Sequence, residues 1–268
     1  MKLSDYVLQT LVANGARHVF FVPGGAAMHL NDSLGRTPGL AYTATLHEQA
    51  AAIAAEAWAK VTNDLAVCMT TAGPGGTNAI TGLAGAWLDS SPVVFLSGQV
   101  KRADLKGKSG LRMLGVQEID IVSIVSSITK YAVTVTEPDS IRWHLEKAIY
   151  LARQPRRGPV WLDLPLDVQA SQVEPAGLEN FEPEGSSAWD EGELPTKVAE
   201  VVSLLAKAER PVLVAGSGIR LAGAIDEFEK LVARLEIPVL TTWLGLDLLA
   251  ENHPFFAGRP GSYPARGG

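Results

Sequence analysis

The sequence predicts an α/β protein whose first domain is a parallel sheet with helices on both faces. Short apolar runs typical of buried strands alternate with segments of helical periodicity, and glycines gather directly after several of these runs. Strands of a parallel sheet are covered on both faces and therefore read as continuous apolar segments. Ligands of such sheets bind beyond the carboxyl ends of the strands. We therefore expect a site near the glycines that follow the strands: Gly24, Gly25, Gly73, Gly75, Gly76 and Gly98.

The first elements alternate regularly between helix and strand. Ser4 is expected to cap a helix that ends near Gly15, and HVFFVPGG then reads as a buried strand that meets a Gly-rich turn. A short helix near 27–34, a strand near 40–44, an alanine-rich helix over 44–60 and a strand over 65–70 follow. The loop TAGPGGTN opens another helix, and PVVFLSGQV is the next predicted strand.

Residues 101–118 interrupt this alternation. They are polar, basic and rich in glycine, a composition that favours a mobile loop. The pattern resumes with a strand in SSITKYAVTV, a helix from Ser140 to about Arg153 and the strand PVWLDLP. The first domain is therefore predicted to cover residues 1–168.

A linker and a second domain follow. Residues 169–194 are rich in Glu, Pro, Gly and Ser and have no period, which is typical of an interdomain linker. After them, a helix over about 195–208, the strand RPVLVAGSG, a helix over 222–235 and the strand IPVLTT indicate the first part of a Rossmann-like or flavodoxin-like central domain. A sheet of so few strands leaves an open edge, so we expect residues 195–268 to be an incomplete domain.

Composition limits the classes of function. The chain has 268 residues, of which 47% are hydrophobic, and a formal net charge of -6. This charge argues against nucleic acid or an anionic membrane as a partner. No apolar stretch of about 18 residues lacks a charge or a turn signal, so neither export nor a membrane span is expected. The single cysteine, Cys68, excludes an internal disulfide and suits a reducing, cytoplasmic compartment.

Glu48 is a carboxylate at the start of the alanine-rich helix. By itself it could be an ordinary first-turn residue that the helix dipole favours. Glu56 lies eight residues further on and is interpreted as structural or interfacial. The loop TAGPGGTN could cradle a phosphate with its backbone N–H groups. The histidines have no metal-ligand spacing, so no metal ligand is assigned in this chain.

Several motifs stand together in one order: PGGAAMHLNDSL, LHEQAAAIAAEAWAK, TTAGPGGTNAITGLAGAWLDSSPVVFLSGQV, VQEIDIVSIVSSITKYAVTV and RRGPVWLDLPLDVQ. Their order and spacing resemble those of thiamine-diphosphate-dependent enzymes, and most closely those of the acetolactate synthase large-subunit group. The resemblance implies decarboxylation of a 2-oxo acid such as pyruvate and transfer of the acyl anion to a second carbonyl. A 2-oxo acid decarboxylase and a sugar-modifying acyl transferase are alternatives that the sequence leaves open.

The resemblance also assigns site residues. In the family the first domain binds the aminopyrimidine ring of thiamine diphosphate, and Glu48 matches the glutamate that hydrogen-bonds the ring nitrogen N1′. A carboxyl group in an apolar wall can share a proton with N1′, which prepares the thiazolium C2 to lose its own proton. Turn geometry alone is the alternative explanation for the glycines of the loop TAGPGGTN. The shell around the ring is expected to contain Pro23, Gly24, Gly25, Gly73, Pro74, Gly75 and Asn78.

Gln117 matches a glutamine that approaches the reaction centre of acetolactate synthases, so the resemblance implies a catalytic and cofactor-binding role for it. An ordinary loop residue without such a role is the alternative. The family commonly has Phe-Gln-Glu at this place, whereas this chain has Val116, Gln117 and Glu118. Because the aromatic neighbour helps to shape the substrate pocket, its loss leaves the acceptor substrate open.

Three residues point to a second cofactor. Arg156 matches an arginine that binds FAD in acetolactate synthases, although Arg157 replaces the proline that follows it in the family. Gly216 and Gly218 follow a strand in the second domain and could contact a nucleotide. FAD is therefore a candidate cofactor, and some relatives bind ADP or nothing in this domain.

Full members of the family are roughly twice as long as this sequence. Their diphosphate and Mg²⁺ are held by a third domain with a Gly-Asp-Gly motif and a downstream Asn, and no such motif occurs here. The chain is interpreted as one subunit of a split enzyme, or as a truncated, catalytically silent product that acts only by association. We expect a homo-oligomer, or a partner subunit that carries the diphosphate-binding domain.

Overall fold

The computed structural model describes residues 1–183 and 192–261. The chain divides into two compact units, residues 1–185 and residues 186–268. Each unit has its own sheet and its own hydrophobic core. Within the described ranges, no helix has the length and apolar character that crossing a membrane requires.

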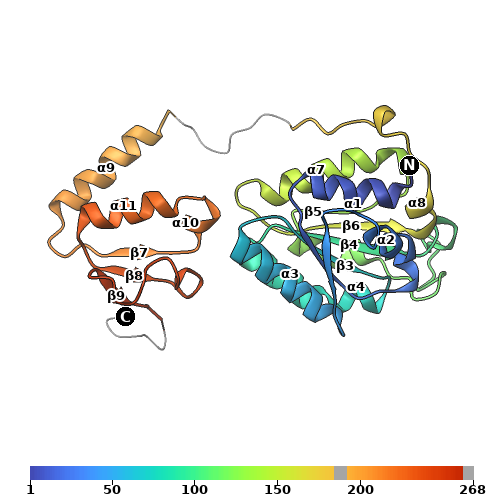
Figure 1. Ribbon diagram of the computed structural model, residues 1–268, viewed down its shortest axis with the longest axis horizontal. Coiled ribbons are helices and arrows are strands. Elements are labelled where there is room, and N and C mark those ends of the chain that lie inside the picture. The colour runs from blue at the N-terminus through green and yellow to red at the C-terminus, as the bar shows by residue number, and fades with distance from the viewer. Residues whose placement is uncertain (184–191, 262–268) are drawn as a thin grey trace. The chain divides into compact units, whose positions relative to one another are not determined.

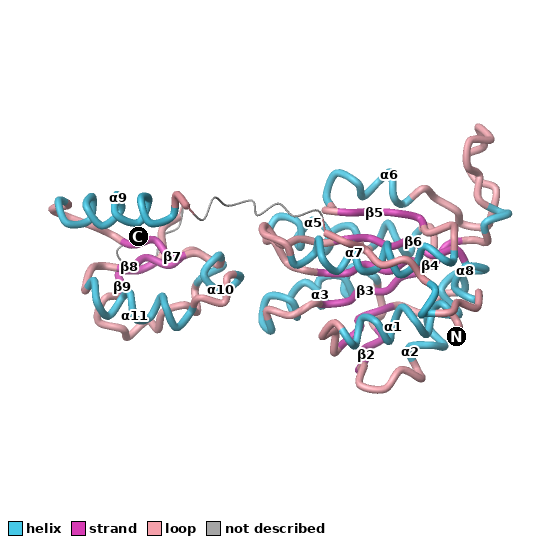
Figure 2. Tube along the Cα trace, turned by 90° about the horizontal axis from the view of Figure 1, so that it is seen from above, coloured by secondary structure: helices cyan, strands magenta, loops and turns pink. Residues whose placement is uncertain are grey.

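The first unit is built on a six-stranded sheet in which all strands run parallel, which confirms the predicted α/β class. In order across the sheet the strands are β2 (Ala41–Ala44), β1 (His18–Phe21), β3 (Ala66–Thr70), β4 (Val93–Gln99), β6 (Val160–Pro165) and β5 (Tyr131–Thr134). Figure 2 shows them side by side, with β2 and β5 at the two edges. The central strands β3 and β4 are buried along their whole length, as their continuous apolar sequences predict.

Helices cover both faces of this sheet (Figure 1). Side chains alternate along a strand, so Val67 and Met69 of β3 pack against one set of helices, and Ala66 and Cys68 pack against the other. The short helix α4 (Pro74–Asn78) follows the end of β3. The first set is α1 (Leu3–Ala13), α2 (Met28–Leu34), α7 (Ile141–Arg153) and α8 (Leu166–Ala170); the second is α3 (Glu48–Thr62), α5 (Ile80–Leu88) and α6 (Ile121–Val125).

Helix α3 is rich in alanine because it packs closely against α5. Its buried stripe recurs every three or four residues and contains Glu48 and Glu56 among the alanines. A Cβ at Gly82 of α5 would lie 2.5 Å from the Cβ of Ala52, so larger residues would push the two helices apart. Glu56 forms a 2.6 Å ion pair with Lys60, which is a structural role of the kind predicted for it.

The predicted N-terminal cap of the first helix is wrong. Helix α1 begins at Leu3, and no side chain caps its first turn. Ser4 is buried inside the helix, where its hydroxyl oxygen accepts a hydrogen bond of 2.9 Å from Ser33 Oγ of α2. The backbone N–H of Leu3 donates to the carbonyl oxygen of Ser171 at 2.8 Å. Tertiary contacts, which local sequence does not reveal, therefore fix where this helix starts.

Part of the predicted linker packs on the first unit. Val173 and Leu178 are buried in its core, and the backbone N–H of Val173 donates to the carbonyl oxygen of Met1 at 2.8 Å. The segment predicted as a linker, residues 169–194, therefore begins as packed chain. Its residues 184–191 lie outside the described residues.

The second unit has a three-stranded parallel sheet in the order β7 (Leu213–Ala215), β8 (Val239–Thr241) and β9 (Phe256–Gly258). Its helices are α9 (Leu194–Lys207), α10 (Gly218–Leu221) and α11 (Ile225–Leu235). Phe228 and Val232 of α11 pack with Val239 in a small core. The sequence pattern does not predict β9, because only three residues form it and Pro254 comes just before them. Residues 262–268 lie outside the described part of the chain.

Candidate cofactor site

Glu48 stands at the edge of the sheet where parallel sheets bind ligands. Strand β2 ends at Ala44 and α3 begins at Glu48, so the carboxylate lies beyond the carboxyl end of a strand. The side chain of His47 caps the helix: its Nδ1 accepts a hydrogen bond of 3.1 Å from the backbone N–H of Gln49. Only 9% of Glu48 is exposed, so protein encloses the carboxyl group on most sides.

Asn78 holds one oxygen of this carboxylate. Its Nδ2 donates to Glu48 Oε2 at 3.0 Å, and it does so from the last residue of α4. The other oxygen, Oε1, forms no hydrogen bond within residues 1–183 and 192–261. The site thus has one carboxylate oxygen fixed in direction and a second one available to a ligand, as a partner for a ring N–H or nitrogen requires.

Glycines keep side chains away from this free oxygen. A Cβ at Gly75 would lie 2.7 Å from Thr71 Cγ2 and 3.6 Å from Glu48 Oε1. A Cβ at Gly24 would lie 2.4 Å from the Cβ of Thr71, so the loop after β1 also closes on Thr71. Thr71 is a site residue that the sequence analysis missed; its only signal is its position directly after a buried strand.

Gln117 joins the same edge of the sheet through Gly73. A Cβ at Gly73 would lie 2.3 Å from the backbone carbonyl oxygen of Gln117, and Gly73 has a φ of +59°. Both conditions require glycine. Gly73 is the N-cap residue of α4, the helix that carries Asn78. The structure therefore brings Glu48, Gly73, Gly75, Asn78 and the Gln117 backbone together.

The loop over 101–118, predicted as mobile, is anchored at several points. The carboxylate of Glu118 accepts hydrogen bonds from the backbone N–H groups of Lys106 at 2.6 Å and Leu114 at 2.9 Å. Arg102 Nε donates to Asp167 Oδ2 at 2.8 Å. These contacts give the loop a defined course from β4 to Gln117.

A buried polar network lies under the end of this loop. Asp163 of β6 is 1% exposed, and its carboxylate accepts hydrogen bonds from Ser97 Oγ at 2.6 Å, Gln99 Nε2 at 3.1 Å and Thr134 Oγ1 at 3.0 Å. Burial raises the pKa of Asp163 to about 6, although these hydrogen bonds act in the opposite direction. The sequence analysis missed this network, although a carboxylate inside the apolar run PVWLDLP was a signal for it.

Other predicted site residues lie on the surface or elsewhere. Pro23 and Gly25 are exposed, and a Cβ at Gly25 would meet no atom within 4 Å. Pro74 is also exposed, at the first position of α4. Gly216 and Gly218 belong to the second unit, after β7 and at the start of α10.

Arg156 lies near the amino ends of the strands, whereas Glu48 lies beyond their carboxyl ends. It precedes β6, and its Nε donates at 2.7 Å to Ser90 Oγ, which precedes β4. The structure therefore does not bring Arg156 together with Glu48. A cavity near these amino ends is lined by Trp87, Leu88, Lys130, Arg156 and Arg157.

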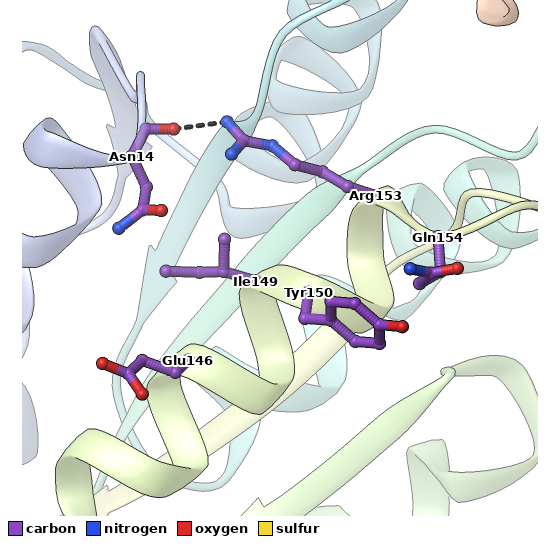
Figure 3. A pocket seen from close by; sticks show the side chains of 6 residues that line it. All are labelled: Asn14, Glu146, Ile149, Tyr150, Arg153 and Gln154. Atoms are coloured by element: carbon purple, nitrogen blue, oxygen red, sulfur yellow. Dashed lines mark hydrogen bonds between the residues drawn. The ribbon is translucent and has the colours of Figure 1, made fainter. Parts of the chain in front are cut away.

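A further cavity lies between the end of α1 and the last turns of α7 (Figure 3). Arg153 donates there to the backbone carbonyl oxygen of Asn14, and both residues come before strands, away from the edge that carries Glu48. Among the described residues, no group of three His, Cys, Asp or Glu side chains could hold a metal ion. The lining of the cavity is Asn14, Glu146, Ile149, Tyr150, Arg153 and Gln154.

Two protein-family profiles match the chain. Residues 1–124 match the thiamine pyrophosphate enzyme N-terminal TPP binding domain, and residues 198–267 match the thiamine pyrophosphate enzyme central domain. Thiamine pyrophosphate, or TPP, is another name for thiamine diphosphate. The first match contains Glu48, Gly75, Asn78 and Gln117.

Curated relatives match nearly the whole chain. The acetolactate synthase large subunit of Lactococcus lactis subsp. lactis (strain IL1403) is 38% identical over 270 residues, which cover 98% of this chain and 45% of that protein. The probable acetolactate synthase large subunit of Methanocaldococcus jannaschii is 35% identical over 98% of this chain and 44% of that protein. For the acetolactate synthase isozyme 2 large subunit of Escherichia coli (strain K12) the values are 33%, 98% and 46%. The chain spans less than half the length of these relatives.

Proposed function

Because the chain belongs to the thiamine pyrophosphate enzyme family, we propose that its first domain, residues 1–168, binds the aminopyrimidine ring of thiamine diphosphate. The observation that carries the proposal is the environment of Glu48. Asn78 holds Oε2, while Oε1 of this largely buried side chain has no hydrogen bond within the described residues and remains accessible to a ligand. The ring nitrogen N1′ is a suitable partner for Oε1, and Gly75 leaves the space beside it free of a side chain.

The residues of this chain orient the ring and exchange a proton with it. Glu48 holds the exchangeable proton at N1′, and Asn78 sets the direction of its carboxyl group. The burial of Glu48 limits competition from water for this proton. Gln117, beside Gly73, is the residue that we propose for contact with the substrate carbonyl. When bound, thiamine diphosphate supplies the carbon centre that adds to that carbonyl.

The proposed reaction is decarboxylation of a 2-oxo acid such as pyruvate and transfer of its acyl group to a second carbonyl. The support is the identity of 33–38% to proteins named acetolactate synthases. Those proteins are more than twice as long as the matched segment. We therefore propose that residues outside these 268 hold the diphosphate and Mg²⁺, in the same polypeptide or in a partner subunit, and that the chain alone does not turn over pyruvate. Sustained acetolactate or acetaldehyde formation by the pure chain would contradict this.

We propose FAD as a second cofactor. Arg156 lies in a cavity with Lys130, Arg157 and Trp87, a cationic and aromatic lining that suits a nucleotide. In the second unit, considered by itself, Gly216 and Gly218 follow β7 and are proposed as nucleotide contacts. A flavin absorbance spectrum of the purified chain supplied with FAD tests this, and the absence of any bound flavin would refute it.

We propose a homo-oligomer that assembles through the first unit, in the cytoplasm. Apolar side chains outside the proposed FAD cavity are exposed on α3, namely Ile53 and Val61. Cys68, the single cysteine, is buried and unpaired, which agrees with a reducing compartment. Light scattering of the purified chain tests the assembly, and a monomeric mass at high concentration would refute it.

Saturation-transfer NMR of thiamine diphosphate with the full chain tests the proposed function. We expect transfer from the protein to the aminopyrimidine protons, and loss of this transfer in Glu48→Ala. Glu56→Ala is the matched control, because Glu56 lies on the same buried stripe of α3 but pairs with Lys60. Equal transfer in Glu48→Ala and in the parent would contradict the role of Glu48.

A further inference from the structure

The carboxamide of Gln99 connects the end of β4 to the Gln117 loop. Its Nε2 donates both to the backbone carbonyl oxygen of Ile119 at 3.0 Å and to Asp163 Oδ2 at 3.1 Å. Its Oε1 accepts from the backbone N–H of Val100 at 3.0 Å. Every polar atom of the carboxamide therefore has a partner, and its orientation has no freedom.

Asp163 is itself fixed from two neighbouring strands. Ser97 of β4 and Thr134 of β5 donate to its two oxygens, and Ser97 Oγ accepts a hydrogen bond of 2.8 Å from Trp161 Nε1. The negative charge of Asp120, the N-cap residue of α6, also acts to raise the pKa of Asp163. No cation pairs with Asp163 in the part of the chain that the structure describes. Its carboxylate is therefore held by hydrogen bonds alone.

We propose that Asp163 is a positioning residue for the thiamine site: through Gln99 it fixes the backbone at Ile119, and thereby the place of Gln117 against Gly73. The inference rests on the proposed function for the meaning of Gln117. Two further contacts limit where the loop end can go. A Cβ at Gly115 would lie 2.8 Å from Val100 Cγ1, and one at Gly73 would lie 2.3 Å from the Gln117 carbonyl oxygen. These close contacts leave the loop end no second packed position. Loss of the Gln99 contact should therefore let the loop end open and not shift to another place.

The charge of Asp163 gives this link a pH dependence. Burial raises the pKa of Asp163 to about 6, so the carboxylate gains a proton just below neutral pH. The hydroxyls of Ser97 and Thr134 can turn to accept that proton, but the N–H of Gln99 can only donate. Its charge-assisted hydrogen bond therefore weakens on protonation. Because Asp163 lies on β6 between β4 and β5, it stays buried when only the loop end lifts away, so the open state loses the Gln99 contact without hydrating the carboxylate. The loop end should therefore open more often below pH 6, although the fold as a whole is more stable there.

Asp163→Asn separates the charge from the shape. With its oxygen toward Gln99 and Thr134, and its amide nitrogen toward Ser97 Oγ, asparagine can keep the contacts of Asp163, but it does not titrate. Gln99→Met is the complementary variant, because it keeps the approximate length and volume of the side chain and removes its hydrogen bonds.

Hydrogen exchange of the full chain, followed by mass spectrometry from about pH 5 to about pH 8, tests the proposal. In the parent, the protection of amides over 100–119, corrected for intrinsic exchange, should fall several-fold below pH 6. That of β1 and β3 should stay constant. Asp163→Asn should lose this pH step, and Gln99→Met should lower the loop protection about 10-fold at every pH. The Trp161 indole N–H resonance should shift with the same midpoint in the parent only.

The outcomes separate the two layers of the inference. Absence of the pH step in the parent, its persistence in Asp163→Asn, or unchanged loop protection in Gln99→Met would overturn the positioning role. A second arm adds thiamine diphosphate to the parent, which should raise the protection of the loop. If the pH step is present but thiamine diphosphate has no effect on any segment, the proposed function is wrong although the link between Asp163 and the loop stands.

Discussion

Gly75→Ala tests whether the glycine beside Glu48 serves packing, the ligand, or both. The new methyl group would lie 2.7 Å from Thr71 Cγ2, about 1 Å inside the optimal separation of two carbon atoms. Gly75 is buried, so the overlap can be relieved only by moving α4 or the Thr71 side chain. We expect a loss of about 1–3 kcal/mol in the free energy of unfolding, the usual cost of overpacking.

Thr71→Ser removes the atom that causes the overlap. Once Cγ2 is gone, the nearest atoms to the new methyl are Thr71 Cβ and Glu48 Oε1, both at 3.6 Å, which is ordinary contact. The double variant should therefore recover most of the stability lost in Gly75→Ala. It should not recover binding of thiamine diphosphate, because the methyl still occupies the space beside Oε1 that the ring requires.

Two measurements on the same four proteins decide the question: the parent, both single variants and the double variant. Urea unfolding gives the coupling free energy between positions 71 and 75, expected at about 1–3 kcal/mol. Saturation-transfer NMR gives relative binding of thiamine diphosphate. If Thr71→Ser restores binding as well as stability, Gly75 serves packing only, and the ligand space beside Glu48 is wrongly assigned.

Two other predictions concern the buried carboxylate of Asp163 and the close approach of Gly73 to Gln117. Burial raises the pKa of Asp163 from 3.8 to about 6, so the native state binds this proton more tightly than the unfolded chain does, and the free energy of unfolding falls as the pH rises from about 4 to about 6. At about 1.4 kcal/mol per pH unit, the loss in the free energy of unfolding is at most about 3 kcal/mol. Urea unfolding should show this loss in the parent and not in Asp163→Asn. An equal pH dependence of the free energy of unfolding in the two proteins would contradict the prediction. Gly73→Ala should cost more than about 1 kcal/mol, because the position has a φ of +59° and faces the Gln117 carbonyl oxygen at 2.3 Å. Gly25→Ala, which meets nothing within 4 Å, is its control, and equal melting temperatures for the two variants would count against this reasoning.

The parallel sheet could be predicted because the continuous apolar sequences of its strands indicate that the strands are buried on both faces. Strands β3 and β4 are continuous apolar runs followed by polar or Gly-rich loops, and their short length and flanking glycines favour a buried strand over a buried helix. Strand β9 has only three residues, which is too short for a periodic signal. The start of α1 also escaped prediction, because Ser4 has the residue type of a helix cap but bonds to Ser33 of a distant segment.

The candidate site could be predicted only in part. The resemblance assigned Glu48 and Asn78 to one cofactor, and the structure joins them by a hydrogen bond of 3.0 Å. It could not assign Thr71, whose importance lies in the two glycines that close on it. Nor does residue type reveal that Gln99 bonds both Asp163 and the loop backbone, since each of these contacts spans about 20 residues or more.

The central claim is that Glu48 exchanges a proton with N1′ of thiamine diphosphate. Exchange of the thiazolium C2 proton for deuterium, measured by NMR on the chain assembled with a diphosphate-binding domain, tests it without knowledge of the acceptor substrate. Glu48→Gln keeps the size of the side chain and a hydrogen bond but removes the acid proton, so exchange should slow by about 10²–10⁴-fold. Glu56→Gln should exchange at the parental rate, since Glu56 pairs with Lys60. If Glu48→Gln exchanges as fast as the parent, Glu48 is only a helix-start carboxylate and the proposed site is wrong.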